Sequence, residues 1–187
     1  MFLTCLVPLG ELVWREYRQD LGAKPVEYIT HQTGIWTLRF LAMTLAATPV
    51  RRIFGVPELI RYRRMLGLYA FFYGYMHLMT YVWLDKLFDF GEMWRDIWKR
   101  PFIIAGLTAF VLMIPLALTS TSWAIGKLGG RRWRMLHRLV YASAAAGVLH
   151  YVWLVKSDVR APLTYAALFT ALFLLRARRE VKNDEAA

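Results

Sequence analysis

Four histidines are the residues whose type and spacing could support redox or metal chemistry in this chain. His77 and His150 each lie within a long apolar stretch, His137 lies at the start of the stretch that contains His150, and His31 lies between two such stretches. Imidazoles at one depth on two neighbouring helices are the axial ligands that a b-type haem requires, one on each face of its iron. We therefore expect a haem between His77 and His150. His31 is interpreted as a structural residue outside the haem slot.

The spacing of these residues predicts an outer and an inner level. His137 precedes His150 by 13 residues and Arg63 precedes His77 by 14, and 13 residues of helix span about 20 Å. An ideal helix would point His137 and His150 to different faces, because 13 residues leave a rotation of about 220°. Either the helix carries a local change of winding, or the two side chains reach different sides of one cofactor slot.

The other residues disfavour competing kinds of site. Cys5 is the only cysteine, so the chain can form neither an internal disulfide nor a cysteine metal cluster. Ligands with zinc-site spacing are absent from the sequence, as are a Walker A motif and a glycine-rich dinucleotide fingerprint. Small residues fill positions 142–147; they suit close helix packing and equally leave room for a macrocycle.

The composition is that of a membrane protein with an excess of positive charge. Hydrophobic residues make up 58% of the 187 positions, the mean hydropathy is +0.35, and the formal net charge is +11. So high an apolar content argues against a disordered chain. It also argues against a soluble basic nucleic-acid-binding protein, whose charge would surround an ordinary core.

Six predominantly apolar stretches have lengths near that of a membrane-spanning helix. They cover residues 2–17, 34–48, 66–84, 102–118, 135–155 and 162–175. We predict an all-α fold, a polytopic bundle of about six transmembrane helices that forms one domain over residues 1–187. The first stretch is short and contains Pro8 and Glu11, and the second is expected to end at Pro49. A cleaved signal peptide is not expected, because the N-terminus lacks a basic region and a cleavage site.

Basic residues are concentrated in the loops on one side of this predicted bundle. Nearly all of the net charge follows the second, fourth and sixth stretches, at Arg51, Arg52, Arg61, Arg63, Arg64, Lys127, Arg131, Arg132, Arg134, Arg138, Arg176, Arg178, Arg179 and Lys182. The positive-inside rule makes this side cytoplasmic. Both termini are then cytoplasmic, and His77 and His150 lie toward the outside. Most of these basic residues are interpreted as solvated or as contacts to lipid headgroups.

Several motifs carry a resemblance to a known family. They are Leu21-Gly22-Ala23-Lys24-Pro25-Val26, Thr33-Gly34, Arg61-Tyr62-Arg63-Arg64-Met65-Leu66-Gly67-Leu68, Leu118-Thr119-Ser120-Thr121-Ser122, Leu136-His137-Arg138-Leu139-Val140-Tyr141 and His150-Tyr151-Val152-Trp153. Together with His77 they resemble the MsrQ family, the haem-binding membrane subunits of the periplasmic methionine sulfoxide reductase system. That family belongs to the ferric-reductase-like transmembrane superfamily. The resemblance covers nearly the whole chain, apart from the start of the first helix.

This resemblance implies a function and a set of partners. It implies a multi-pass protein of the bacterial inner membrane that binds one or two haem b groups. Electrons would come from the quinone pool or from a cytoplasmic flavin reductase. They would pass to a periplasmic, MsrP-like molybdopterin subunit that reduces methionine sulfoxide in oxidised proteins. FMN is implied by the family alone, because no residue pattern in the sequence locates it.

The resemblance also assigns roles to individual residues. Eukaryotic ferric reductases and NADPH oxidases of the superfamily hold two haems between their third and fifth helices, with two histidines on each helix. His77 and His150 match the outer pair, and His137 matches one inner ligand. Arg63 stands at the other inner position, where a guanidinium is a poor iron ligand. It can pair with a haem propionate, or the inner haem is five-coordinate or absent.

Two alternatives to this electron-transfer function have different requirements. A small transporter or assembly factor without redox activity would show polar residues clustered at mid-membrane on broken helices. The sequence offers few such features, chiefly Arg39, His77 and Pro115. A self-sufficient ferric or oxygen reductase would need its own flavin and nicotinamide domains. No site that reduces a substrate is expected within this chain.

Overall fold

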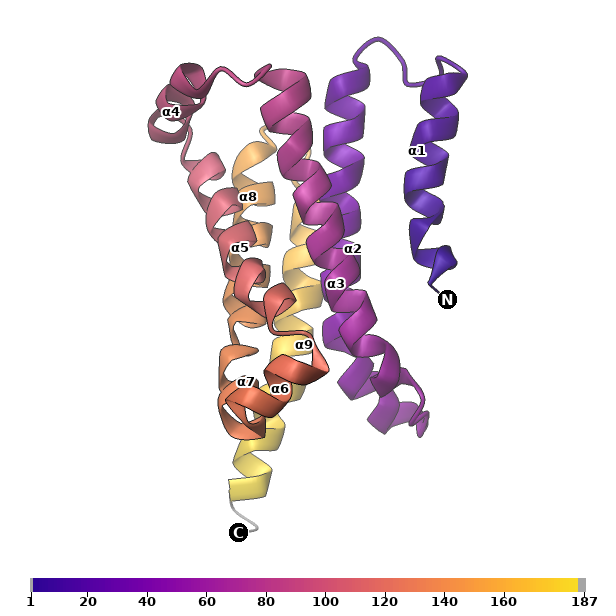
Figure 1. The fold of residues 1–187 in the computed structure, drawn as a ribbon, viewed down its shortest axis with the longest axis vertical. Coiled ribbons are helices and arrows are strands. Elements are labelled where there is room, and N and C mark those ends of the chain that lie inside the picture. Colours follow the sequence, from indigo (N-terminus) through magenta and orange to yellow (C-terminus); the bar gives the residue numbers. More distant parts are fainter. Residues whose placement is uncertain (1, 185–187) are drawn as a thin grey trace.

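The computed structural model describes the backbone of residues 2–184 and the side chains of residues 2–176, and within this range the fold is all-α, as predicted (Figure 1). A 3₁₀ turn, Leu3–Leu6, leads into α1 at Val7–Tyr17, followed by α2 at Pro25–Phe54 and α3 at Leu59–Met79. A π-helical segment, Thr80–Asp85, extends α3 and is followed by α4 at Phe90–Lys99 and α5 at Pro101–Leu118. The remaining helices are α6 at Ser122–Leu128, α7 at Gly130–Leu136, α8 at Leu139–Leu154 and α9 at Arg160–Asp184. The side chains of Arg178, Arg179 and Lys182, from the predicted basic set, lie outside the described residues.

Two helix pairs form the centre of the bundle. The closest neighbours are α2 with α3 and α5 with α8, and α9 packs against α8 and α2. Figure 1 shows the long helices roughly parallel to the long axis, with α1 at one edge. The core between them contains Phe40, Leu45, Ala70, Tyr73 and Ala144. This pairing brings α3 and α8, which carry two of the histidines, to opposite walls of one interior.

Tyrosines of α3 attach the N-terminal segment to the bundle. The Tyr73 hydroxyl donates to the Cys5 carbonyl at 2.9 Å and accepts from the Leu9 N–H at 3.2 Å. The Tyr69 hydroxyl donates to the Phe2 carbonyl at 2.8 Å. The first predicted stretch is thus a helix whose beginning is held against α3 at about mid-height of the bundle (Figure 1).

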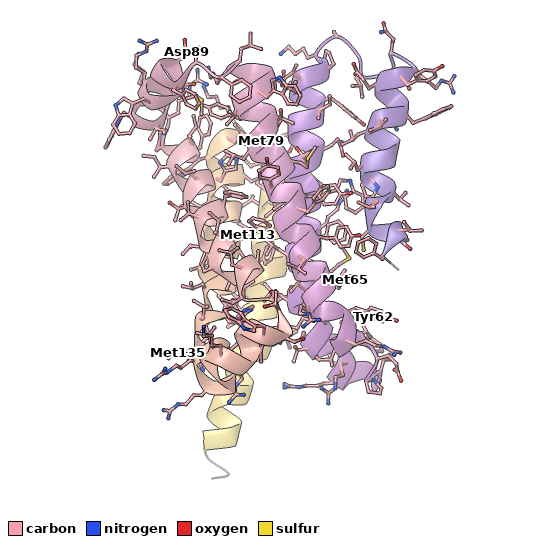
Figure 2. All side chains as sticks on the ribbon, in the orientation of Figure 1. Tyr62, Met65, Met79, Asp89, Met113 and Met135 are labelled. Carbon is pink, nitrogen blue, oxygen red and sulfur yellow. The ribbon has the colours of Figure 1, made fainter. Side chains whose placement is uncertain are left out.

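The two ends of the bundle differ in the residues they expose. The turn between α2 and α3, together with α6 and α7, lies at the end where the C-terminus emerges, and the α1–α2 loop and α4 lie at the opposite end (Figure 1). Nitrogen-tipped side chains project from the first end around Tyr62 and Met135 (Figure 2).

Within the described residues, α5 is the one helix whose length and composition alone suit a membrane crossing, with a mean hydropathy of 2.3.

Helix α2 is longer than the predicted stretch and does not end at Pro49. It continues to Phe54 and terminates at Gly55, which has φ 67°, a left-handed conformation that favours glycine. Proline at position 49 supplies no N–H, so the Leu45 carbonyl one turn earlier lacks its helical donor. Arg176 of α9 replaces this donor, because its Nη2 lies 2.7 Å from the Leu45 oxygen. A contact from a distant helix therefore allows α2 to pass through Pro49.

Replacing Arg176 by methionine should destabilise the protein by roughly 1–3 kcal/mol, because a buried carbonyl then lacks a donor. The loss should be smaller in a Pro49→Ala background, where the residue 49 N–H can bond to Leu45. Unfolding in detergent of both single variants and the double variant measures this coupling. Arg51→Met, at an exposed position on α2, is the control. Equal losses in both backgrounds would show that Arg176 does not act through the Leu45 carbonyl.

A buried ion pair anchors α4 to the end of α3. Lys86 Nζ lies 2.9 Å from Asp96 and 2.6 Å from Glu92, and the Lys86 and Asp96 side chains are 7% and 9% exposed. Leu87 and Phe88 connect the helices with φ of 47° and 62°, a conformation uncommon for such residues. The hydrogen bond to Glu92 makes the largest contribution to raising the pKa of Lys86, and the hydrogen bond to Asp96 makes the next largest. The bond from Lys86 likewise lowers the pKa of Asp96.

The attachment of α4 should be insensitive to pH across the neutral range. Asp96, with a lowered pKa, stabilises the fold above its ordinary pKa of 3.8, and this contribution is lost as pH falls through the lower folded value. Lys86, with a raised pKa, stabilises it below 10.5, and this is lost only as pH rises through the higher folded value. Hydrogen exchange of α4 amides should therefore stay constant from about pH 5 to 9 once corrected for intrinsic rates. Lys86→Met should accelerate it and Arg95→Met should not; a transition near neutral pH would contradict the assignment.

Candidate functional site

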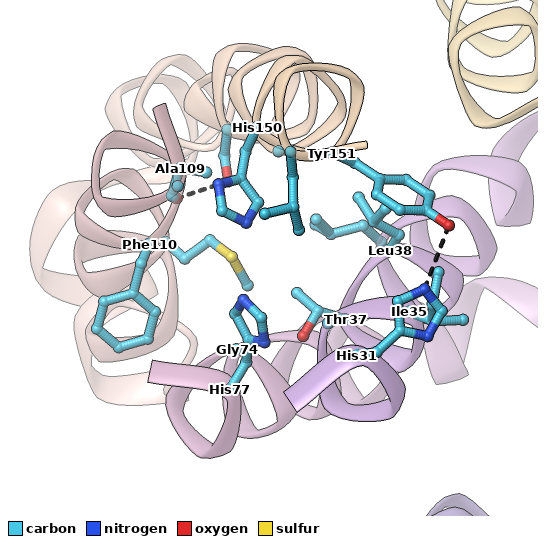
Figure 3. Close-up of a pocket in the computed structure, with 17 residues that line it drawn as sticks. His31, Ile35, Thr37, Leu38, Gly74, His77, Ala109, Phe110, His150 and Tyr151 are labelled. Carbon is cyan, nitrogen blue, oxygen red and sulfur yellow. Dashed lines mark hydrogen bonds between the residues drawn. The ribbon is translucent and has the colours of Figure 1, made fainter. Parts of the chain in front are cut away.

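A cavity of about 90 Å³ lies between α2, α3, α5 and α8, and we call it the outer cavity. His77 of α3 and His150 of α8 line it from opposite walls, with their rings pointing toward one another (Figure 3). Their ring centroids are 5.9 Å apart, and the ring planes are inclined by 78°. Two imidazoles that coordinate one iron from opposite faces have centroids roughly 6 Å apart, because each metal–nitrogen bond is about 2 Å. The separation of the rings therefore suits a metal between them.

Backbone carbonyls orient both imidazoles. His77 Nδ1 lies 2.9 Å from the Thr30 carbonyl oxygen of α2, and His150 Nδ1 lies 2.6 Å from the Phe102 carbonyl oxygen of α5. A carbonyl oxygen can only accept, so each Nδ1 carries the proton and each Nε2 presents a lone pair to the cavity. A hydrogen bond at the second nitrogen is the usual way in which proteins orient a histidine ligand.

Two glycines make space for these rings. A Cβ added to Gly106 of α5 would lie 2.7 Å from His150 Nδ1, and one added to Gly34 of α2 would lie 3.1 Å from the His77 ring. Each imidazole thus packs directly against the backbone of the neighbouring helix. Sequence reasoning did not assign these glycines to the site; the available signal was a glycine within each of two apolar stretches.

His31 lines the outer cavity, which corrects its expected position outside the slot. Helix α2 begins at Pro25 rather than at residue 34, so His31 lies within the helix and not in a loop. Its Nε2 is 3.4 Å from the Tyr151 hydroxyl of α8 (Figure 3). The early start of α2 therefore adds a third histidine to the same cavity.

A second cavity, of about 210 Å³, lies toward the basic end of the bundle, and we call it the inner cavity. Arg63 of α3 and His137 line it together, as the spacing predicted. Leu41 and Met113 line both cavities, so the two adjoin within the bundle. Among the described residues, no carboxylate forms an ion pair with Arg63.

His137 is not part of one continuous helix with His150, in contrast to the predicted stretch 135–155. Helix α7 ends at Leu136 and α8 begins at Leu139. The Arg138 N–H bonds to the Met135 carbonyl and the Tyr141 N–H to the Arg138 carbonyl, so the chain is more tightly wound between the two helices. An ideal helix would point residues 13 apart to different faces, and one of the two expected solutions was a local change of winding. The junction between α7 and α8 is such a change.

The surroundings of His137 differ from those of the outer histidines. Its ring stacks on Trp133 at 3.9 Å, and its Nε2 lies 3.1 Å from the Thr119 hydroxyl. That hydroxyl donates its own hydrogen to the Pro115 carbonyl at 2.6 Å, so His137 Nε2 is the donor to Thr119. In this arrangement His137 presents no free Nε2 lone pair, unlike His77 and His150.

The potential metal ligands of the outer cavity suit a cofactor that brings further ligands of its own to the metal. Within the described part of the chain, no three His, Cys, Asp or Glu side chains converge as they would around a bare metal ion. A structural zinc site would need four such ligands. Two opposed imidazoles with free Nε2 atoms are instead sufficient for the iron of a haem.

Comparisons with known proteins agree with the sequence motifs. The family model described as "Ferric reductase like transmembrane component" matches residues 33–148. The "Protein-methionine-sulfoxide reductase heme-binding subunit MsrQ" of Herminiimonas arsenicoxydans is 51% identical over 94% of this chain and 82% of its own length. Proteins of the same name from Caulobacter vibrioides and Polaromonas naphthalenivorans are 47% and 45% identical. They align with 94% and 100% of this chain and with 84% and 89% of their own lengths.

Proposed function

Because this chain belongs to the MsrQ family of ferric-reductase-like transmembrane proteins, we propose that it carries electrons across the bacterial inner membrane by means of haem b held between His77 and His150. The observation that carries the proposal is the pair of opposed imidazoles, 5.9 Å apart, whose Nδ1 atoms are both held by backbone carbonyls. A haem bound there would supply a one-electron iron couple.

The residues of the outer cavity have separate tasks in this proposal. His77 and His150 would hold the iron through Nε2, and the Thr30 and Phe102 carbonyls keep both rings in the tautomer that this requires. Gly34 and Gly106 allow the rings to lie against α2 and α5. The apolar remainder of the lining excludes water, and low solvent exposure is one of the factors that set a haem's reduction potential.

The inner cavity is the proposed place for a second haem, with His137 as its ligand and Arg63 beside it. Arg63 faces this cavity without an ion-pair partner among the described residues, which leaves its guanidinium able to bind a propionate. For His137 to bind iron through Nε2, its bond to Thr119 must be released. The inner site therefore requires a rearrangement that the outer site does not.

Charge supports an orientation for this transfer. Among the described residues, the exposed charged side chains at the end that holds the inner cavity are basic apart from Glu58, whereas exposed basic residues at the opposite end are accompanied by acids such as Glu16 and Asp89. By the positive-inside rule, the inner-cavity end and both termini would lie in the cytoplasm. The outer cavity then lies toward the periplasm. Electrons would enter from quinone or a cytoplasmic flavin reductase and leave to an MsrP-like periplasmic subunit that repairs methionine sulfoxide. FMN stays an expectation from the family, because no described residue cluster locates it.

The proposal is tested on the purified full-length protein, expressed with haem available. We expect a red protein with a sharp α-band after reduction by dithionite, and at least one haem per chain. The haem-to-protein ratio of the His137→Ala variant beside wild type then counts the sites, because this variant should lose only an inner haem. Well-folded protein without a haem spectrum would refute the proposal.

A further inference from the structure

The outer cavity contains a second polar pair, His31 and Tyr151, that iron ligation does not use. The two side chains lie on α2 and α8 and bridge the gap between these helices on the side of the cavity away from His77 and His150 (Figure 3). His31 is exposed, whereas Tyr151 is buried. The pair therefore joins the surface of the protein to the interior of the cavity.

Among the described residues that line the cavity, the hydrogen bonds leave only this polar pair available to a ligand. The four other polar side chains in the described lining have partners on the backbone: Thr37 donates to Thr33, Ser143 to Ala109, His77 to Thr30 and His150 to Phe102. Among the described residues, His31 and Tyr151 are hydrogen-bonded only to each other, and their separation of 3.4 Å is near the limit for a hydrogen bond. Side chains that hold one another so loosely can donate to a third group at little cost.

A carboxylate is the group that two such donors suit. An ionised carboxylate in an apolar cavity needs charge-assisted hydrogen bonds to replace its water. An imidazole N–H and a phenolic O–H supply two of them, at the point where the cavity meets the surface. In the part of the chain that the structure describes, no lysine or arginine lines the outer cavity to take this role.

We propose that His31 and Tyr151 together bind a propionate carboxylate of the haem in the outer cavity and thereby fix how the porphyrin lies between His77 and His150. This inference rests on the proposed function. A carboxylate of a small molecule from outside would satisfy the same donors. The porphyrin is favoured because the pair and both Nε2 atoms face one continuous cavity.

The test compares haem release from protein loaded with haem b and with its dimethyl ester, which lacks the carboxylates. Tyr151→Phe and His31→Leu should each release haem b to an excess of apomyoglobin about tenfold faster than wild type, because a bond to a charged group is lost. With the dimethyl ester, both variants should match wild type. Tyr165→Phe is the control, since Tyr165 packs against Tyr151 without a hydrogen bond to it.

The outcomes separate this inference from the proposed function. Unchanged release of haem b from both variants would overturn the inference, and so would equal acceleration with the ester, which would indicate lost packing. In either case a bis-imidazole spectrum of the loaded proteins leaves the proposed function intact. Wild-type protein that takes up neither form of haem would instead refute the proposed function itself.

Discussion

Alanine at either His77 or His150 should remove the same haem from the protein. Each variant lacks one of two axial ligands, and His31, the third histidine of the cavity, lies on its other side beside Tyr151, so we expect occupancy of the outer site to fall below about one tenth of wild type. Optical spectra of the purified variants and their haem-to-protein ratios measure this effect. Electron transfer to any periplasmic acceptor should be lost in parallel.

Neighbouring substitutions control for damage to the helices. Tyr75→Ala on α3 and Leu149→Ala on α8 change exposed residues close to the ligands, and both should keep the full spectrum. His137→Ala should also keep the outer haem. A His77 or His150 variant that retains both the spectrum and the midpoint potential would show that the ligand pair is wrong.

Substitution of Gly106 should damage the outer site without removing a ligand. The added Cβ of Gly106→Ala would lie 2.7 Å from His150 Nδ1, closer than such atoms approach, so the ring must move and its bond to the Phe102 carbonyl must lengthen. Loss of a hydrogen bond behind a metal ligand typically lowers affinity by about 10- to 100-fold. Titration of haem-free protein with haem measures this change.

Two other glycines form a graded series with Gly106. Gly34→Ala brings its Cβ to 3.1 Å from the His77 ring, which calls for a smaller shift, and we expect a smaller loss of affinity. Gly126→Ala on α6 has no atom within 4 Å of the new Cβ and should bind haem as wild type does. If all three variants bind equally well, the glycines do not define the space for the rings.

The helical bundle and the proximity of His77 and His150 were predictable because they depend on local properties of the chain. Long apolar stretches predict helices whatever their neighbours are, and the rise of a helix converts residue spacing into depth. His77 and His150 could therefore be paired from their positions along the chain. The short helices α4, α6 and α7 were not predicted, because they are too short or too charged to resemble a membrane span.

Helix ends were predicted less well because they depend on partners far along the chain. Proline at position 49 removes a donor from α2, and only the packing of α9 reveals that Arg176 supplies another to Leu45. The same limit applies to His31, which was assigned to a loop because the apolar stretch begins only at residue 34. The polar first turns of α2 are helical and bring this histidine to the cavity.

By itself, the sequence determined the all-α membrane class, the excess of positive charge at one end, and the placement of His77 and His150 at one depth on neighbouring helices. These features follow from composition and from distances along single helices. The tertiary structure alone decided which nitrogen of each imidazole is free, that Gly34 and Gly106 admit the rings, and that His31 and Tyr151 share the cavity. Those properties arise where side chains of one helix meet the backbone or side chains of another. Such contacts depend on the packing and the relative rotation of neighbouring helices. The spacing of residues along a single helix does not reveal either of these.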